Sequence, residues 1–175
     1  LVYDQLSAID RPAPPSEILI VRIDEDSLAD FGKWPWPRRR HAELFDRLAT
    51  ERPKAIGFDV LLSEPGDADD DAQLARAMAG NANLFLPLHF VFPGSGGAEY
   101  DVKKPIASFA DSAAGLGHVN LIFDRDGVIR RAALCFGDKK TGQAWPHLIE
   151  QIYRSIHHRP SPAYNQLKDC EQKLL

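Results

Sequence analysis

The stretch ILIVRIDEDSLADFGKWPWPRRR, from Ile18 to Arg40, decides how the chain is expected to fold. It opens with Ile18–Ile23, in which five of the six residues are apolar. Such a run, rich in β-branched side chains, predicts a central strand that is covered on both faces. Acidic residues, a tryptophan–proline segment and three arginines follow at once. The sequence therefore predicts a buried strand whose end places charged side chains at one edge of a sheet.

A second strand with the same design is expected at Lys54–Ser63. Between the two strands, the segment His41–Thr50 places its apolar residues on one stripe at helical spacing, which predicts a connecting helix. A strand, a helix and a second strand in this order predict a right-handed parallel βαβ unit. The two strands would then end at the same edge of the sheet.

That edge is where open α/β sheets bind their ligands. Asp24 follows the first strand, Asp59 lies near the end of the second, and Glu64 comes just after it. Two unpaired carboxylates at close range would repel each other, and the pKa of at least one would rise. We therefore expect Arg38 or a bound cation between Asp24 and Asp59.

Other short-range patterns predict the elements that follow. The acidic run Asp67–Asp71 precedes apolar positions at helical spacing, so we interpret it as a capped helix start and not as a calcium loop. Leu84–Phe92 predicts a third buried strand, in which Pro87 favours an edge position or a bulge. An Asp-Gly turn between Gly117–Phe123 and Val128–Phe136 predicts a hairpin.

The last amphipathic helix is expected to open with Pro146 at its first position. Strands that alternate with helices and end in a hairpin predict an α/β (or α+β) fold. In detail, we expect a mixed β-sheet with a parallel βαβ core and a C-terminal hairpin, with helices packed on the sheet. Residues 1–160 form one domain in this interpretation, and residues 161–175 form a C-terminal tail or juxtamembrane helix.

Composition narrows the class of protein. The chain has 175 residues, of which 44% are hydrophobic and 26% charged, as is usual for a globular domain. Its net charge of −4 gives no general attraction for nucleic acid. Cys135 lies in an apolar strand and is interpreted as a free buried thiol, with a disulfide to Cys170, the only other cysteine, left open.

The motifs also carry a family resemblance through their order along the chain. They are IVRIDEDSL (Ile20–Leu28), GKWPWPR (Gly32–Arg38), His41, IGFDVLLSEP (Ile56–Pro65), GLGHVN (Gly115–Asn120) and DRDGVIRRAAL (Asp124–Leu134). From about Tyr3 to His158, the chain resembles the type-two CHASE domains, which are extracytoplasmic sensory modules of bacterial receptors. In that family, the outputs are cyclases, histidine kinases, diguanylate cyclases or protein kinases.

The resemblance implies a periplasmic sensor domain that binds a small polar ligand or a periplasmic protein, is joined to the membrane through flanking segments and forms a homodimer. It implies no catalytic residue, metal or cofactor. A mixed lining of carboxylates, arginine and aromatic rings suits a polar ligand. The residues expected to line the site are Asp24, Ser27, Trp36, Arg38, His41, Asp59, Glu64, His118 and Asn120.

Three alternatives stay open at this point. The strand followed by Asp24 and Asp26 resembles the first motif of haloacid-dehalogenase-like phosphatases, in which the first aspartate attacks phosphorus and the second transfers a proton. The domain could also dimerise receptors without sensing anything. Finally, the individual residues have structural explanations, since Trp36 fits a packing plug and His118 and Asn120 fit buried polar groups with internal partners.

Overall fold

The computed structural model of the chain describes residues 15–91, 101–137 and 141–159. These residues divide into two compact units, the first ending at Trp36 and the second beginning at Pro37. The predicted domain boundary at residue 160 and the expected tail lie outside the described residues.

In the first unit, the prediction of a strand at Ile18–Ile23 is wrong. This segment takes part in no ladder in the described ranges. Its five apolar side chains are exposed, from 43% at Ile23 to 84% at Leu19. A strand needs hydrogen bonds from a neighbouring strand, and β-branched composition alone cannot supply them.

A short helix, α2 (Glu25–Phe31), follows this segment, and Gly32 is its C-cap. The Trp36 indole Nε1 donates to the Gly32 carbonyl at 2.8 Å. The Trp36 ring also meets the Phe31 and Trp34 rings edge-on, at centroid distances of 5.5 and 5.8 Å. These contacts make Trp36 a packing plug on the end of α2.

The second unit is built on a four-stranded mixed sheet. Its central strand is β2 (Leu84–Val91), which pairs in parallel with β1 (Ile56–Gly57) and β4 (Gly115–His118), and antiparallel with β3 (Asp101–Lys103). The expected strand Lys54–Ser63 contributes only the two residues of β1 to this ladder.

Pro87 lies in the middle of β2 and not at an edge, which corrects the sequence expectation. The β1 ladder ends opposite Phe85, and the β3 ladder begins opposite His89. Pro87 therefore falls in the gap between two neighbours along one side of β2, where its missing N–H breaks no ladder on that side.

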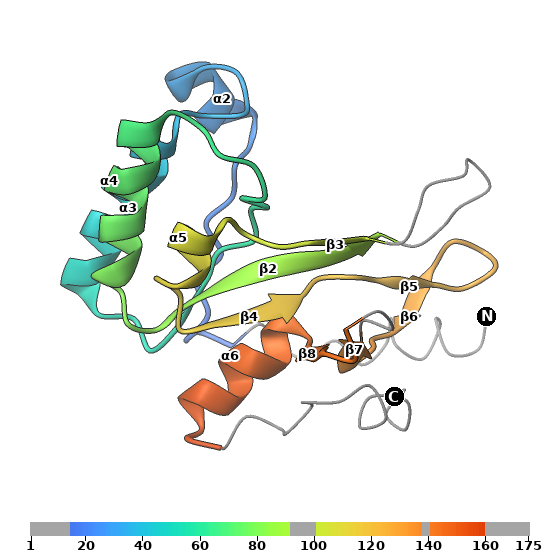
Figure 1. Cartoon of the computed structure of the whole chain (residues 1–175). Coiled ribbons are helices and arrows are strands. Elements are labelled where there is room, and N and C mark those ends of the chain that lie inside the picture. Colours follow the sequence, from blue (N-terminus) through green and yellow to red (C-terminus); the bar gives the residue numbers. More distant parts are fainter. Residues whose placement is uncertain (1–14, 92–100, 138–140, 160–175) are drawn as a thin grey trace. The chain divides into compact units, whose positions relative to one another are not determined.

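Helices cover both faces of the sheet (Figure 1). On one face lie α3 (Arg38–Glu51), α4 (Ala68–Ala79) and the short α5 (Ala107–Ala110), and on the other lies α6 (Leu148–Ile156). The main core joins the first three helices to Leu84 and Leu86 of β2. The predicted helices at 41–50 and after Asp67 are confirmed, and Asp67 caps α4 through bonds from two backbone N–H groups.

The C-terminal strands are shorter than expected. The predicted strand Gly117–Phe123 divides into the end of β4 and β5 (Ile122–Phe123), and β5 pairs with β6 (Ile129–Arg131) around the predicted Asp-Gly turn. A further pair joins β7 (Cys135–Gly137) to β8 (Ala144–Pro146). Pro146 is thus a strand residue, and His147 takes the N-cap of α6.

Cys135 is disulfide-bonded, so the interpretation as a free thiol is wrong. Cys170 lies outside the described residues. The fold class itself is confirmed, since the structure is a mixed α/β arrangement with a parallel β1–β2 pair and C-terminal hairpin strands.

Among the glycines in the described ranges, Gly117 of β4 leaves the least room for a Cβ, because the start of α6 packs against it. A Cβ added at Gly117 would fall on the Leu148 backbone, which cannot move aside as a side chain can. We therefore expect Gly117→Ala to lower the free energy of unfolding by about 3 kcal/mol or more. Urea denaturation measures this loss.

Gly115→Ala is the matched control on the same strand, because its Cβ would meet the Phe85 ring at 3.4 Å, close to ordinary contact. We expect a cost below about 1 kcal/mol at Gly115. Equal losses at the two glycines would contradict the packing described for Gly117.

Candidate functional site

The nine predicted site residues are divided between the two units, and each unit is described by itself. Asp24, Ser27 and Trp36 belong to the first unit. In the second unit, Arg38, His41 and Glu64 gather at the start of α3, whereas Asp59, His118 and Asn120 lie with the strands and the start of α6. Each group is best understood from its own contacts.

Asp24 and Ser27 form a reciprocal capping box at the start of α2. The Asp24 carboxylate accepts from the Ser27 backbone N–H at 3.2 Å and from its hydroxyl at 2.7 Å. The hydrogen bond from the Ser27 hydroxyl is the main reason why the pKa of Asp24 lies below its usual value. This carboxylate is therefore satisfied locally, with Arg22 as its ion-pair partner at 3.5 Å.

Arg38 forms the centre of a half-buried cluster that we call the Arg38 cluster, composed of Arg38, His41, Glu64, Gly66 and Asp71. The Arg38 Nε lies 3.5 Å from Asp71 Oδ1, and a terminal guanidinium nitrogen donates to the Glu64 backbone carbonyl at 3.2 Å. Asp71 also accepts from the Gly66 N–H at 2.7 Å. The ion pair thereby ties the start of α3 to α4 and to the loop before it.

His41 lies one turn after Arg38 and is 3% exposed. Its ring packs edge-on against Phe58 at a centroid distance of 5.3 Å. Burial, with a smaller contribution from the Arg38 charge, lowers the pKa of His41 to about 4. His41 is therefore neutral at physiological pH and leaves Arg38 as the cation of the cluster.

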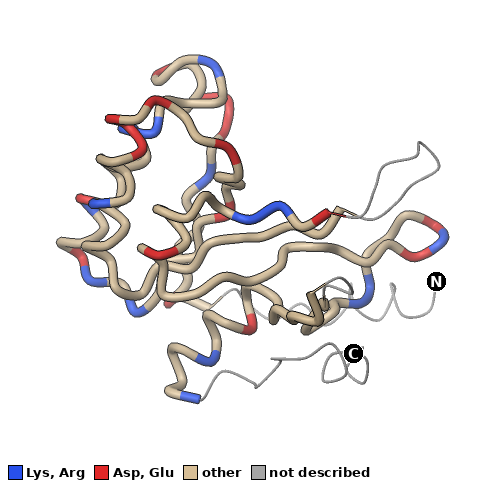
Figure 2. Tube along the Cα trace, in the orientation of Figure 1, with Lys and Arg blue, Asp and Glu red and all other residues tan. Residues whose placement is uncertain are grey.

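The three arginines at the start of α3 point to three different acidic partners. Arg38 pairs with Asp71, Arg39 with Asp70 at 3.3 Å, and Arg40 with Glu43 at 3.5 Å. In the second unit, basic positions lie beside acidic ones and do not gather on one face (Figure 2). The dense basic run is thus divided among separate ion pairs, as the helical spacing predicts.

Asn120 acts as a structural clamp. Its side-chain oxygen accepts from the Phe90 N–H at 2.8 Å, and its amide donates to the Phe90 carbonyl at 2.7 Å. Both bonds are buried, so Asn120 continues the pairing of β2 beyond the end of β4. Both polar atoms of the Asn120 side chain are therefore used to hold this segment to β2.

His118, two residues earlier, is fully buried among aromatic rings. Its ring lies 4.7 Å from Phe136 and 4.9 Å from His147, centroid to centroid. Burial is the main reason why the pKa of His118 falls to about 3, with His147 acting in the same direction and the Ala133 backbone opposing them. His118 is neutral in the folded protein.

The expected bridge between Arg38 and Asp59 does not appear among the contacts of the described residues. Asp59 instead acts on His147, where its charge opposes the burial that lowers the pKa of this histidine. The reason is geometric: Asp59 is near the start of α6, whereas Arg38 is held by Asp71 of α4. Asp24 belongs to the first unit, and its prediction stays untested in relation to Asp59.

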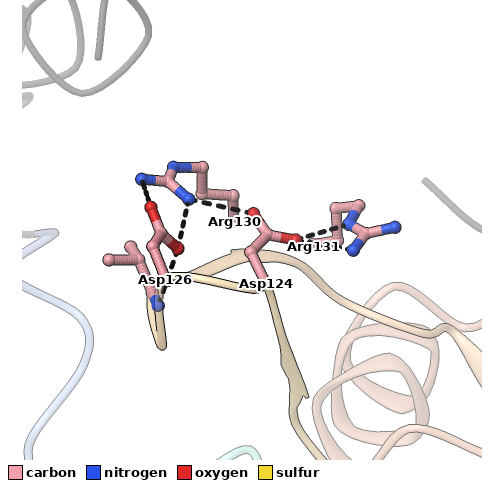
Figure 3. A network of polar contacts seen from close by, with 5 residues as sticks. Asp124, Asp126, Arg130 and Arg131 are labelled. Carbon is pink, nitrogen blue, oxygen red and sulfur yellow. Dashed lines mark hydrogen bonds and ion pairs between the residues drawn. The ribbon is translucent and has the colours of Figure 1, made fainter.

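A further charged network that the sequence analysis did not select holds the β5–β6 hairpin (Figure 3). Arg130 contacts Asp124 at 3.0 Å and Asp126 at 2.8 Å, and Arg131 contacts Asp124 at 2.6 Å. These contacts lower the pKa of both aspartates, that of Asp126 to about 2. The network fixes the turn and leaves its carboxylates paired.

No helix in the described ranges combines the length and apolar character needed to cross a bilayer. Within the same ranges, no three side chains of His, Cys, Asp or Glu are grouped so that they could hold a metal ion. A family model for the CHASE2 domain matches residues 1–172, which is nearly the whole chain.

The chain belongs to the CHASE2 family. CHASE2 domains are extracellular sensory domains of signalling receptors, so the resemblance inferred from the sequence motifs is confirmed. Searches among curated proteins and among solved structures gave no match.

Sequence reasoning missed two residues that organise this CHASE2 domain. Asp71 was interpreted as part of a helix-capping run, but it is buried and lies on the side of α4 that meets Arg38. Its position three residues before the apolar Leu74 was the available signal, because residues at this spacing share a helix face. His147 was missed because Pro146 was expected to open α6.

The Arg38–Asp71 and Arg39–Asp70 pairs form a matched comparison across the same two helices. The Arg38 and Asp71 side chains are 19% and 11% exposed, whereas Arg39 is 56% exposed. Arg38→Ala would leave Asp71 partly buried without its cation, so we expect a loss of about 2–4 kcal/mol in the free energy of unfolding. Arg39→Ala should cost about 0.5 kcal/mol or less.

Urea denaturation of both variants checks the comparison. Asp71→Asn should partly restore stability when combined with Arg38→Ala, because it removes the unpaired charge. Additive losses in this double variant would contradict direct coupling between the two residues.

The buried histidines predict a pH dependence of stability. His41 and His118 have folded pKa values of about 4 and about 3, below the value of 6.5 expected after unfolding. Their contribution is fully present above pH 6.5 and is lost as the pH falls, because the unfolded chain then binds protons that the folded chain does not. Each should add a slope of about 1.4 kcal/mol per pH unit near pH 5.

Urea unfolding between pH 7.5 and pH 5 measures this slope. His41→Gln and His118→Gln should each reduce it, whatever their effect on stability at neutral pH. Replacement of the exposed His157 is the control. An unchanged slope in both buried variants would disprove the assignment.

Proposed function

We propose that this chain is the extracytoplasmic sensory domain of a bacterial membrane receptor, that it binds a small polar ligand, and that its signal passes to an output domain outside the chain. The CHASE2 match over residues 1–172 carries this proposal. A cyclase, histidine kinase, diguanylate cyclase or protein kinase is the proposed output. The domain itself is proposed to be non-catalytic and to act as a homodimer joined to the membrane by flanking segments.

The Arg38 cluster supports a ligand with a carboxylate or a similar planar anion. A guanidinium carries five N–H donors in a rigid fork, which matches a carboxylate bidentately. In the structure, the Nε of Arg38 faces Asp71 and one terminal nitrogen faces the Glu64 carbonyl, at the relatively long distances of 3.5 and 3.2 Å. A ligand carboxylate would give Arg38 a shorter, charge-assisted contact.

The disulfide at Cys135 supports an exported location. Disulfides persist in the periplasm and outside the cell, and they are rare in the reducing cytosol. This observation is independent of the family match and agrees with it.

The phosphatase alternative finds little support in the structure. Its nucleophile would be Asp24 at the end of a strand, but Ile18–Ile23 is not a strand in the described structure. The Asp24 carboxylate instead accepts two hydrogen bonds from Ser27 as a helix cap. Asp26, the proposed acid–base partner, lies in the first turn of α2.

A dimerisation module that senses no ligand is the second candidate function. Ile149, Tyr153 and Ile156 of α6 are exposed by 69%, 46% and 36%, at helical spacing on one stripe. An apolar stripe of this kind is typical of a contact surface.

A thermal-shift screen of organic acids, amino acids, nucleotides, sugars and divalent ions tests the proposal. A ligand present at about 100 times its dissociation constant stabilises the folded state by about 2.7 kcal/mol. We expect a compound with a carboxylate to raise the melting temperature of the 175-residue chain. Arg38→Lys, which keeps the charge but loses the fork, should abolish that shift, and Arg39→Lys should retain it.

A panel without any stabilising compound would contradict the sensor proposal. Concentration-dependent association that Tyr153→Glu abolishes would then favour the dimerisation module. If a stabilising ligand binds the Arg38→Lys variant as tightly as the unmodified chain, the ligand site lies outside the Arg38 cluster.

A further inference from the structure

The end of β4 and the start of α6 are joined backbone to backbone. Gly117 of β4 leaves no room for a side chain against Leu148. The next residue, His118, forms an isolated parallel bridge with His147, and the His147 N–H donates to the Leu134 carbonyl at 2.8 Å. The first turn of α6 is therefore held at a fixed point of the sheet.

The residue at this point, His147, caps α6 with its side chain. Its Nδ1 accepts from the Ile149 backbone N–H at 3.2 Å. An imidazole nitrogen can accept a hydrogen bond only while it carries no proton. The usual capping side chains, Ser, Thr, Asn and Asp, keep their acceptors throughout the range near neutral pH, so this cap differs from them in being titratable.

The charged and titratable groups near His147 come from several elements. Burial disfavours the protonated form of His147, whereas the charge of Asp59, after β1, favours it. The ring of the buried His118 of β4 lies 4.9 Å from the His147 ring, centroid to centroid. On α6 itself, Glu150 is paired with Arg154 at 2.6 Å. On the β8 side, Lys104 lies over the Trp145 ring at 4.3 Å from its centroid.

These surroundings determine which histidine takes up a proton first. His118 is fully buried, and its pKa falls to about 3. His147 is only half-buried and has Asp59 nearby, although burial still lowers its pKa below 6.5. As the pH falls, His147 is therefore protonated before His118.

We infer that the start of α6 is a proton-sensitive joint, in which protonation of His147 removes the cap and loosens the first helical turn from the end of β4. The lost acceptor leaves the Ile149 N–H unpaired. The new imidazolium also faces the positive end of the α6 dipole. Both effects destabilise the first turn of α6.

The joint would make the attachment of α6 to the sheet depend on external pH. Whether this change is transmitted as a signal rests on the proposed function, but the joint itself does not. It is measured in the domain alone, so its failure and the failure of the sensor proposal are separate results.

Native-state hydrogen exchange of the 175-residue chain tests the inference, with rates corrected for the intrinsic effect of pH. The informative amides are those of Ile149 and Gln151, which donate to the His147 side chain and carbonyl. As the pH is lowered from 7 through the range in which the β2 amides keep their protection, the protection of these two amides should fall about five-fold, as expected for the loss of a cap. Amides in the middle of β2 report on global unfolding.

His147→Asn keeps a capping acceptor that does not titrate, and His147→Ser is a second variant of the same kind. Either variant that folds should lose the pH dependence at Ile149 and Gln151. His157→Asn, at the other end of α6, should behave like the unmodified chain. The inference is overturned if Ile149 and Gln151 of the unmodified chain keep their protection as the pH falls. It is also overturned if these two amides lose as much protection in the Asn and Ser variants as in the unmodified chain.

Discussion

The pairing of β2 with three other strands is the constraint on which the second unit depends. Five consecutive residues, Leu84–Leu88, are buried, so every backbone group along this stretch needs a partner inside the protein. β1 and β4 supply partners on the two sides, and β3 continues the ladder beyond Pro87. Asn120 then adds two hydrogen bonds to Phe90 where β4 has already ended.

The faces of this strand determine where the helices lie. Leu84 and Leu86 point into the core formed with α3, α4 and α5, whereas Phe85 lies near Gln151 of α6, beside the position of Gly115. The period of two thus separates two regions with different chemistry. The Arg38–Asp71 ion pair ties together the starts of α3 and α4 on one side, and the imidazoles of His118 and His147 meet on the other.

The two regions differ in the charge state of their ionisable groups. Around Arg38, charges are retained and paired, so either residue of the pair is sensitive to removal of the other. Around His118, burial removes the charge, and the ring contributes as an aromatic side chain that becomes unfavourable at low pH. In the motif that contains His118 and Asn120, the Asn120 amide completes the pairing of β2, and the His118 ring packs among aromatic side chains.

The sequence by itself determined the local elements and the family. Capping residues and apolar periodicity located α3 and α4, because these signals act within one or two helical turns. The ordered motifs identified a CHASE2 domain. Tertiary structure decided what local patterns cannot encode. Ile18–Ile23 has strand composition but forms no ladder with any other part of the chain that the structure describes, because pairing depends on a neighbour distant in sequence. Likewise, tertiary structure decided that Arg38 pairs with Asp71 and that Asp59 acts on His147. Both interactions depend on which helix packs beside which strand end.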